Sequence, residues 1–271
     1  MKNNGQTQRE EADRLFCARI ADMARQQQRD NLPCFTRFLD EREQRLAAIE
    51  LRRQHFPQDQ VCFWAGFDVP QEAPARRMLG LFPDYLALSE GMDRAILEEQ
   101  FPIQRVALFF RAQDAITHRD ILGSLMGLNL KRELIGEILT GEDFAVVFCT
   151  GAAAQLILSE LERVGRAGIK KQQGYEGELP PLYRLEYQTG TVSSLRLDCA
   201  VSLATNLSRE KSAALIEGGQ VSLNFFEENK ISREVGEGDI LSIRGYGRYV
   251  LSKVGSVSKK GRLHLTLGKY V

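Results

Sequence analysis

The chain has 271 residues, of which 43% are hydrophobic and 27% charged, and its 36 basic residues balance 36 acidic ones. This is the composition of a globular protein, long enough for one large domain or for two to three small ones. No apolar run approaches the roughly 20 residues of a membrane helix, and the amino terminus lacks the apolar segment of a secretion signal. Five scattered cysteines form no C-x-x-C pair, which argues against a disulfide framework or a zinc site and favours a reducing cytoplasm.

The first 54 residues are densely charged, with 11 basic and 9 acidic side chains. Apolar residues recur at loose helical spacing and predict two amphipathic helices, the second with Pro33 in its first turn. We expect these helices to pack on the segment that follows, in preference to forming a separate RNA-binding arm. Residues 1–58 are therefore predicted to be a helical amino-terminal segment.

From Val61 onward, three short apolar runs rich in β-branched and aromatic residues predict buried strands: VCFWAGF, RVALFF and FAVVFCT. Helices are predicted between and after them, over residues 73–81, 93–99, 117–139 with a break near Gly127, and 152–165. This alternation indicates a layered α/β or α+β arrangement. Residues 170–181 collect Gly, Pro and polar side chains and predict a surface loop, and YRLEYQTG predicts one more strand. Phe63, Trp64 and Phe67 could stack on bases, but the core is the favoured position for them.

The last part of the chain has the clearest pattern. LRLDCAVSLAT places its apolar residues on one helix face, and Ser208 is a good N-cap for a second helix that ends at Gly218 and Gly219. The alternation of Val221 and Leu223 with polar residues predicts a half-buried strand. Residues 196–271 carry 12 Lys or Arg against 8 Asp or Glu, which fits an anionic partner or plain solubility about equally.

This order of features resembles the S-four-type RNA-binding domain, also called the alpha-L motif. The matching residues are RLD at 196–198, LSREKSAALIEGGQVSLN at 207–224 and EVGEGDILSIRG at 234–245. Phe225 stands where many such domains have Gly after the Asn. The sequence therefore differs from the pattern of these domains at the hairpin turn.

THRDILGSLMGLNLKRELIGEIL at 117–139 is similar to the signature of the YlmH-type proteins, a bacterial family with this domain at the carboxyl end, and RGYGRYVL at 244–251 is similar to the family's ending. The resemblance covers most of residues 60–260. It implies an α+β protein with a helical segment (1–58), an RNA-binding middle domain resembling an alpha-beta plait (59–187) and an S-four-type domain (188–271). It implies no enzymatic activity, cofactor or metal.

The same resemblance implies partners and a location. We expect ribosomal RNA and tRNA on the large ribosomal subunit to be the partners, in quality control of stalled nascent chains in the cytoplasm. We expect a monomer with no small-molecule substrate and no membrane attachment.

Candidate RNA contacts in the last domain follow from simple chemistry. A helix N-terminus presents unpaired N–H groups, so Ser208 and Arg209 at the helix start suit a phosphate. Gln220, Ser222 and Asn224 on one strand face can bond 2′-hydroxyls and base edges. The alternative is that Ser208 only caps its helix and Arg209 is only solvated. Further candidates for the basic surface are Arg196, Lys211, Lys230, Arg244 and Arg248.

The middle domain offers two smaller clusters. His118, Arg119 and Asp120 are adjacent, but neighbours on a helix do not face each other and no nucleophile accompanies them, so RNA contact or helix capping is favoured over acid–base catalysis. Lys131 and Arg132 are predicted to lie at a helix start suited to phosphate, or to be a solvated helix end.

An RNA-modifying enzyme is the main alternative. Pseudouridine synthases often carry an S-four-type domain, and their catalytic motif contains an RLD tripeptide. The only such tripeptide here, at 196–198, begins the first helix of the binding domain, which leaves no second copy for a catalytic Asp.

Overall fold

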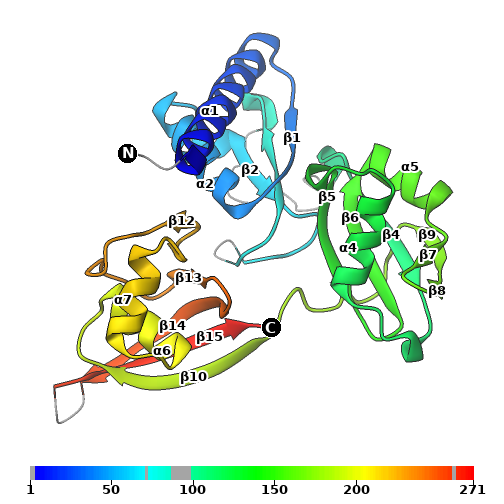
Figure 1. The fold of residues 1–271 in the computed structure, drawn as a ribbon. Helices are drawn as coiled ribbons and strands as arrows, with labels where there is room; N and C mark the ends of the chain where they lie inside the picture. Colours follow the sequence, from blue (N-terminus) through cyan, green and yellow to red (C-terminus); the bar gives the residue numbers. More distant parts are fainter. Residues whose placement is uncertain (1–3, 71–72, 87–98, 258–260) are drawn as a thin grey trace. The chain divides into compact units, whose positions relative to one another are not determined.

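The computed structural model describes residues 4–70, 73–86, 99–257 and 261–271. The chain divides into two compact units, Met1–Leu182 and Tyr183–Val271 (Figure 1). Within the described residues, no helix is long and apolar enough to cross a membrane. The same part of the chain contains no group of three or more His, Cys, Asp or Glu that could hold a metal ion.

The first unit begins with two helices packed on a small sheet. The helices are α1 (Asn4–Asp30) and α2 (Glu41–Arg53), and the antiparallel strands lie in the order β1-β3-β2: β1 (Cys34–Leu39), β2 (Val61–Trp64) and β3 (Arg77–Leu81). Leu51 of α2 and Ile20 of α1 bury against Leu79 and Leu81 of β3. The strand predicted at VCFWAGF and assigned to the middle domain therefore belongs to the sheet of the amino-terminal helices.

Two predictions for this region are wrong. The second helix begins at Glu41 instead of near Pro33, because Asp40 and Glu43 form a capping box there and CFTRFL, with its aromatic residues, forms β1. Residues 73–81 were predicted to be helical, but RMLGL forms β3, the central strand, with all five residues buried. A strand buried on both faces has no alternation that would distinguish it from a helix. The predicted helix at 93–99 lies almost entirely outside the described residues.

The rest of the first unit is an alpha-beta plait. Its elements follow the order β-α-β-β-α-β: β4 (Ile103–Phe109), α4 (His118–Gly127), β5 (Ile135–Thr140), β6 (Phe144–Thr150), α5 (Gly151–Glu160) and β9 (Lys170–Gln173). The strands lie antiparallel in the order β5-β6-β4-β9, which is the ferredoxin-like arrangement. A short hairpin of β7 (Arg163–Val164) and β8 (Ala167–Gly168) precedes β9.

For the predicted helix over 117–139, the first half and the break near Gly127 are confirmed, but the second half is wrong. The helix ends at Gly127, a single 3-10 turn η4 (Arg132–Leu134) follows, and the remainder is β5. Likewise, the first residues of the predicted 170–181 loop form β9 at the edge of the sheet.

Both faces of the plait sheet are covered. On one face, Val147 packs with residues of α4 and α5, such as Ile121 and Ile157. On the other face, Phe148 packs with an aromatic cluster from the amino-terminal sheet and the segments that follow it: Phe38, Trp64, Phe67, Phe82 and Phe101. The core position favoured for Trp64 and Phe67 is confirmed, and the sheet face is not a surface for bases.

The second unit is a six-stranded antiparallel sheet with two helices on one face. In order across the sheet the strands are β10 (Leu185–Val192), β15 (Leu263–Tyr270), β14 (Gly247–Val257), β13 (Ile240–Ile243), β11 (Val221–Leu223) and β12 (Phe226–Glu227). The helices α6 (Leu197–Thr205) and α7 (Arg209–Glu217) bury Val201 and Ile216 against Val221 and Leu223. Both helices and the predicted exit at Gly218 are confirmed. The predicted boundary at residue 188 would cut β10.

The hairpin between β11 and β12 turns through Asn224 and Phe225. Leu223 pairs with Phe226, and both loop residues have positive φ, 51° and 72°. Such a two-residue turn favours Asn at its first position and Gly at its second. Phe225 is therefore strained, and the Arg248 guanidinium lies 5.4 Å from the centre of its ring.

Candidate RNA interface

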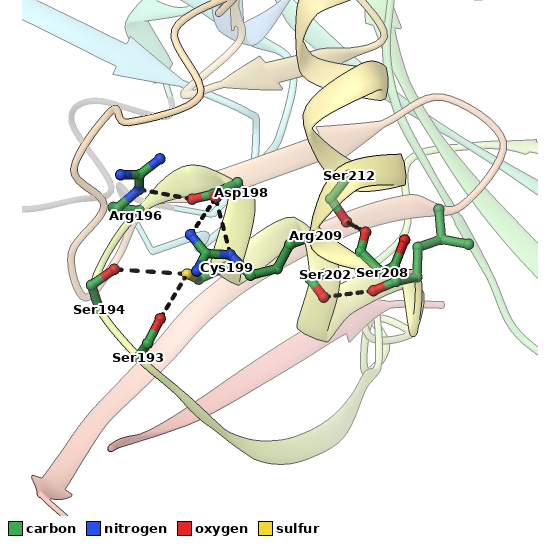
Figure 2. A network of polar contacts seen from close by, with 10 residues as sticks. Ser193, Ser194, Arg196, Asp198, Cys199, Ser202, Ser208, Arg209 and Ser212 are labelled. Atoms are coloured by element: carbon green, nitrogen blue, oxygen red, sulfur yellow. Dashed lines mark hydrogen bonds and ion pairs between the residues drawn. The ribbon is translucent and has the colours of Figure 1, made fainter. Parts of the chain in front are cut away.

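One buried carboxylate holds two arginines at the starts of α6 and α7. Asp198 Oδ1 accepts from Nε of Arg196 at 3.1 Å, and its Oδ2 accepts from Nη2 and Nε of Arg209 at 2.6 and 3.2 Å (Figure 2). The Asp198 side chain is 5% exposed, whereas those of Arg196 and Arg209 are 42% and 54% exposed. The sequence places Arg196 just before α6 and Arg209 first in α7, and the turn between the helices brings both to Asp198.

The charges of this triad, which consists of Asp198, Arg196 and Arg209, do not cancel. Burial by itself raises the pKa of the Asp198 carboxyl, but hydrogen bonds from Arg209 and Arg196 outweigh it, so the pKa lies below its usual value. The carboxylate is thus ionised at neutral pH, and the triad carries one net positive charge. Two guanidinium groups held in place lose little side-chain entropy when they bind an anion.

The start of α7 adds polar groups beside Arg209. The side chain of Ser208 accepts a hydrogen bond from the Lys211 backbone N–H at 3.3 Å, which confirms the predicted N-cap. Ser208 therefore caps the helix, Arg209 is anchored by Asp198 as well as exposed, and the phosphate contact stays a prediction. The Lys211 side chain is exposed on the same first turns.

A second polar surface lies on the opposite side of the sheet from α6 and α7. Val221 and Leu223 face the helices, so Ser222 between them faces the other way. Ser222 is paired with Ser242, and Ser242 with Arg248, which places the three side chains in a row across β11, β13 and β14. Gln220 and Arg244 extend this face, since the Arg244 N–H donates to the Gln220 carbonyl at 2.9 Å.

Asn224 is used inside the domain, and this changes its predicted role. Its Nδ2 donates to Asp239 Oδ1 at 2.7 Å and its Oδ1 accepts from the Ile240 N–H at 3.1 Å. These bonds fix the β11–β12 turn to β13, so the amide is a structural group first. Lys230 lies exposed in the connection that follows β12.

The predicted residues of the middle domain fall into two kinds. Thr117 and Asp120 form the capping box of α4, which explains Asp120 without RNA. His118 and Arg119 are exposed, and the pKa of His118 is lowered by desolvation and by the positive charges of Arg132 and Arg119. The structure thus brings the two predicted clusters close to each other.

Arg132 differs from its neighbour Lys131. The Arg132 Nη1 donates to the carbonyls of Ile135 and Gly136 at 2.5 and 3.0 Å, and desolvation lowers its pKa to about 10. Lys131 is exposed before a single 3-10 turn. The predicted helix start is absent from this described segment. The guanidinium of Arg132 instead fixes the backbone at the start of β5 through its two hydrogen bonds.

Two residues of interest were not among the predicted contacts. Arg262, at the start of β15, lines a cavity together with Arg209. Phe225 lies against Arg248 at the turn. No motif marks Arg262, whereas the departure of Phe225 from the Gly of similar domains was visible in the sequence.

Comparison with known proteins identifies the family. Residues 98–175, which contain the plait, match the family model described as "Putative RNA-binding domain in YlmH". A solved structure of the cell division protein ylmH from Streptococcus pneumoniae aligns with a TM-score of 0.45 at 19% identity, over 60% of this chain and 92% of that one. The Bacillus subtilis protein named "Ribosome-associated protein quality control protein P2" is 32% identical over 235 residues, covering 85% of each chain. The chain therefore belongs to the YlmH-type family of RNA-binding proteins.

Proposed function

We propose that the protein is a non-enzymatic RNA-binding protein that contacts ribosomal RNA and tRNA on the large ribosomal subunit. It acts in the cytoplasm as a monomer, in quality control of stalled nascent chains, and its second unit is an S-four-type domain. One observation carries the RNA contact: the two half-exposed guanidinium groups that Asp198 fixes at adjacent helix starts. The ribosomal role rests on family membership and on the name of the Bacillus relative.

The geometry suits a phosphate backbone better than a small molecule. Guanidinium groups bind phosphate oxygens through paired N–H donors, and the first N–H groups of a helix add partial positive charge. Ser208 and Lys211 extend this surface along α7. Because the sheet face of the plait is covered, the middle domain would bind RNA through other residues, and exposed His118, Arg119 and Lys131 are the candidates.

The alternative of a pseudouridine-synthase-like enzyme needs an accessible catalytic Asp. Asp198 of the RLD tripeptide is buried, and both of its oxygens accept hydrogen bonds from arginines. That arrangement favours a positioning role for Asp198 over attack on a base.

Sedimentation of the tagged protein in a cell extract tests the proposal. We expect the parent protein to move with large ribosomal subunits and to shift to a slow free peak after ribonuclease treatment. Arg209→Gln should reduce the bound fraction, whereas Arg233→Gln, which removes an exposed arginine paired with Glu228, should not. Thermal melts of both variants control for folding.

Two outcomes would contradict the proposal. Migration with subunits that survives complete RNA digestion would indicate a protein partner. A slow free peak in every extract, with a modified nucleoside missing from a deletion strain, would favour the enzyme.

A further inference from the structure

A cavity of about 320 Å³ lies in the second unit between α6, the end of β10 and the start of β15. This volume is at the lower end of the roughly 300–1,000 Å³ of small-ligand sites. Its lining includes Val192, Ser193, Cys199, Leu203, Arg209 and Arg262.

Two arginines from distant parts of the chain line this cavity, and both are anchored. Asp198 holds Arg209 through two hydrogen bonds, and Arg262 Nη2 donates to the Thr191 carbonyl at 2.6 Å. Among the described residues that line the cavity there is no Asp or Glu. Anchored cations without a lining carboxylate favour an anionic ligand, because part of the ordering entropy is already lost before binding.

The remaining lining suits a sugar and a base. Val192 and Cys199 are buried and Leu203 is half-buried, so the inner wall is apolar, while Arg209 and Arg262 are exposed and lie toward solvent. Ser193 contributes an exposed hydroxyl. An apolar wall with hydroxyls behind cationic groups matches a base and ribose behind their phosphate.

We infer that this cavity takes one nucleotide of a single-stranded RNA segment, with its phosphate between Arg209 and Arg262. The inference rests on the proposed RNA binding and adds a defined subsite to it. It also assigns a role to Arg262, which no sequence motif marks.

Binding of a labelled ten-nucleotide oligouridylate to the full chain at several salt concentrations tests the inference. Arg262→Gln keeps a donor for the Thr191 carbonyl but removes the charge, so affinity should fall about tenfold or more. The slope of log affinity against log salt should flatten by roughly 0.7. Ser193→Trp fills the cavity without changing charge, so affinity should fall similarly with the slope unchanged. Arg233→Gln, outside the cavity, should keep the affinity within about twofold.

Competition distinguishes a nucleotide from a phosphate alone. Uridine monophosphate should displace the oligonucleotide at concentrations where inorganic phosphate of equal ionic strength does not, and equal displacement by both would overturn the inference. If the parent binds but Arg262→Gln and Ser193→Trp bind equally well, the cavity is not the subsite, although RNA binding stands. If the parent binds neither the oligonucleotide nor extracted ribosomal RNA, the proposed function fails as well.

Discussion

At the scale of single residues, the carboxylate of Asp198 decides where two arginines point. An acidic residue at an RNA-binding surface ordinarily repels phosphate, yet this one is 5% exposed and neutralised by its two partners. In the proposed RNA interface its role is therefore indirect, through the orientation of Arg196 and Arg209.

Asp198→Asn should lower the free energy of unfolding by about 1–3 kcal/mol at pH 7, because a buried acceptor of charged donors is lost. The pKa of Asp198 is lowered by folding, so its contribution is complete above the unfolded pKa of about 3.9 and is lost as pH falls through the folded value. Urea unfolding of parent and variant should thus differ constantly from pH 5 to 8 and converge below pH 4. Glu228→Gln, at a more exposed ion pair, is the control and should change stability by under about 0.5 kcal/mol.

Lys131 and Arg132 should respond differently to the same substitution. Arg132→Gln should lower the free energy of unfolding by about 2 kcal/mol, because two backbone carbonyls lose a charged hydrogen-bond donor. Lys131→Gln should change stability by no more than about 0.5 kcal/mol. Thermal or urea unfolding of the two variants measures this contrast, and equal losses would show that Lys131 is structural too.

The positions of Ser208 and Arg209 could be predicted from the sequence, because a cap and the first helical residue are local features. The partner of Arg209 could not, since Asp198 reaches it only through the packing of α6 against α7. For the same reason Asn224 was predicted to be an RNA contact: its bond to Asp239 joins the β11–β12 turn to the residue just before β13, which is distant in the sequence.

At the scale of elements, the β11–β12 hairpin combines a favourable and an unfavourable residue. Asn224 tolerates the left-handed conformation and is tied to β13, whereas Phe225 has a φ of 72° that L-residues with a Cβ rarely adopt. The arginine against its ring offsets part of that cost.

Phe225→Gly and Phe225→Ala separate the two contributions. Both remove the ring, but only Gly relieves the backbone, so the Gly variant should be more stable than the Ala variant by about 1 kcal/mol or more. Urea unfolding of the 183–271 unit or of the full chain gives this difference. Equal stability of the two variants would mean that the turn carries no strain.

The elements also show where sequence patterns stop being informative. Period-two alternation predicted β11, which is half-buried, but β3 is buried on both faces and has no alternation to read. The stretch 128–139 continues the apolar residues of α4, yet Asn129 takes a φ of 58° just after Gly127 and ends the helical path. The break near Gly127 could be predicted, but the change from helix to strand after it could not, because the apolar residues of β5 continue without a clear alternation.

At the scale of the whole molecule, the boundary between the two units is set by which segments share a hydrophobic core. Changes in sequence composition along the chain do not mark it as well. Residues 61–81 differ in composition from the amino-terminal helices but share their sheet, and the plait shares the aromatic cluster with that sheet. The second unit has its own core and its own six strands.

Fragments should fold according to these cores. Residues 183–271 should give a cooperative thermal transition and dispersed amide resonances, and residues 188–271 should melt lower, because the shorter fragment loses three residues of β10 that pair with Gly268, Lys269 and Tyr270. Residues 59–187 should fail to fold, since Phe38 is missing from the aromatic cluster and β3 loses its pairing with β1. A stable 59–187 fragment would contradict the shared core.

The aromatic cluster has a consequence for the time at which the first unit can close during synthesis. Phe38, Trp64 and Phe67 are made well before Phe148, whose ring centre lies 4.6 Å from that of Phe67 in the finished core. Because synthesis adds roughly 5–20 residues per second, several seconds pass between the synthesis of Phe67 and that of Phe148. During that interval the nascent chain exposes a hydrophobic aromatic surface, which is a target for chaperones and a risk for aggregation. The second unit has a comparable interval, because its first strand, β10, pairs with β15, the last strand to be made.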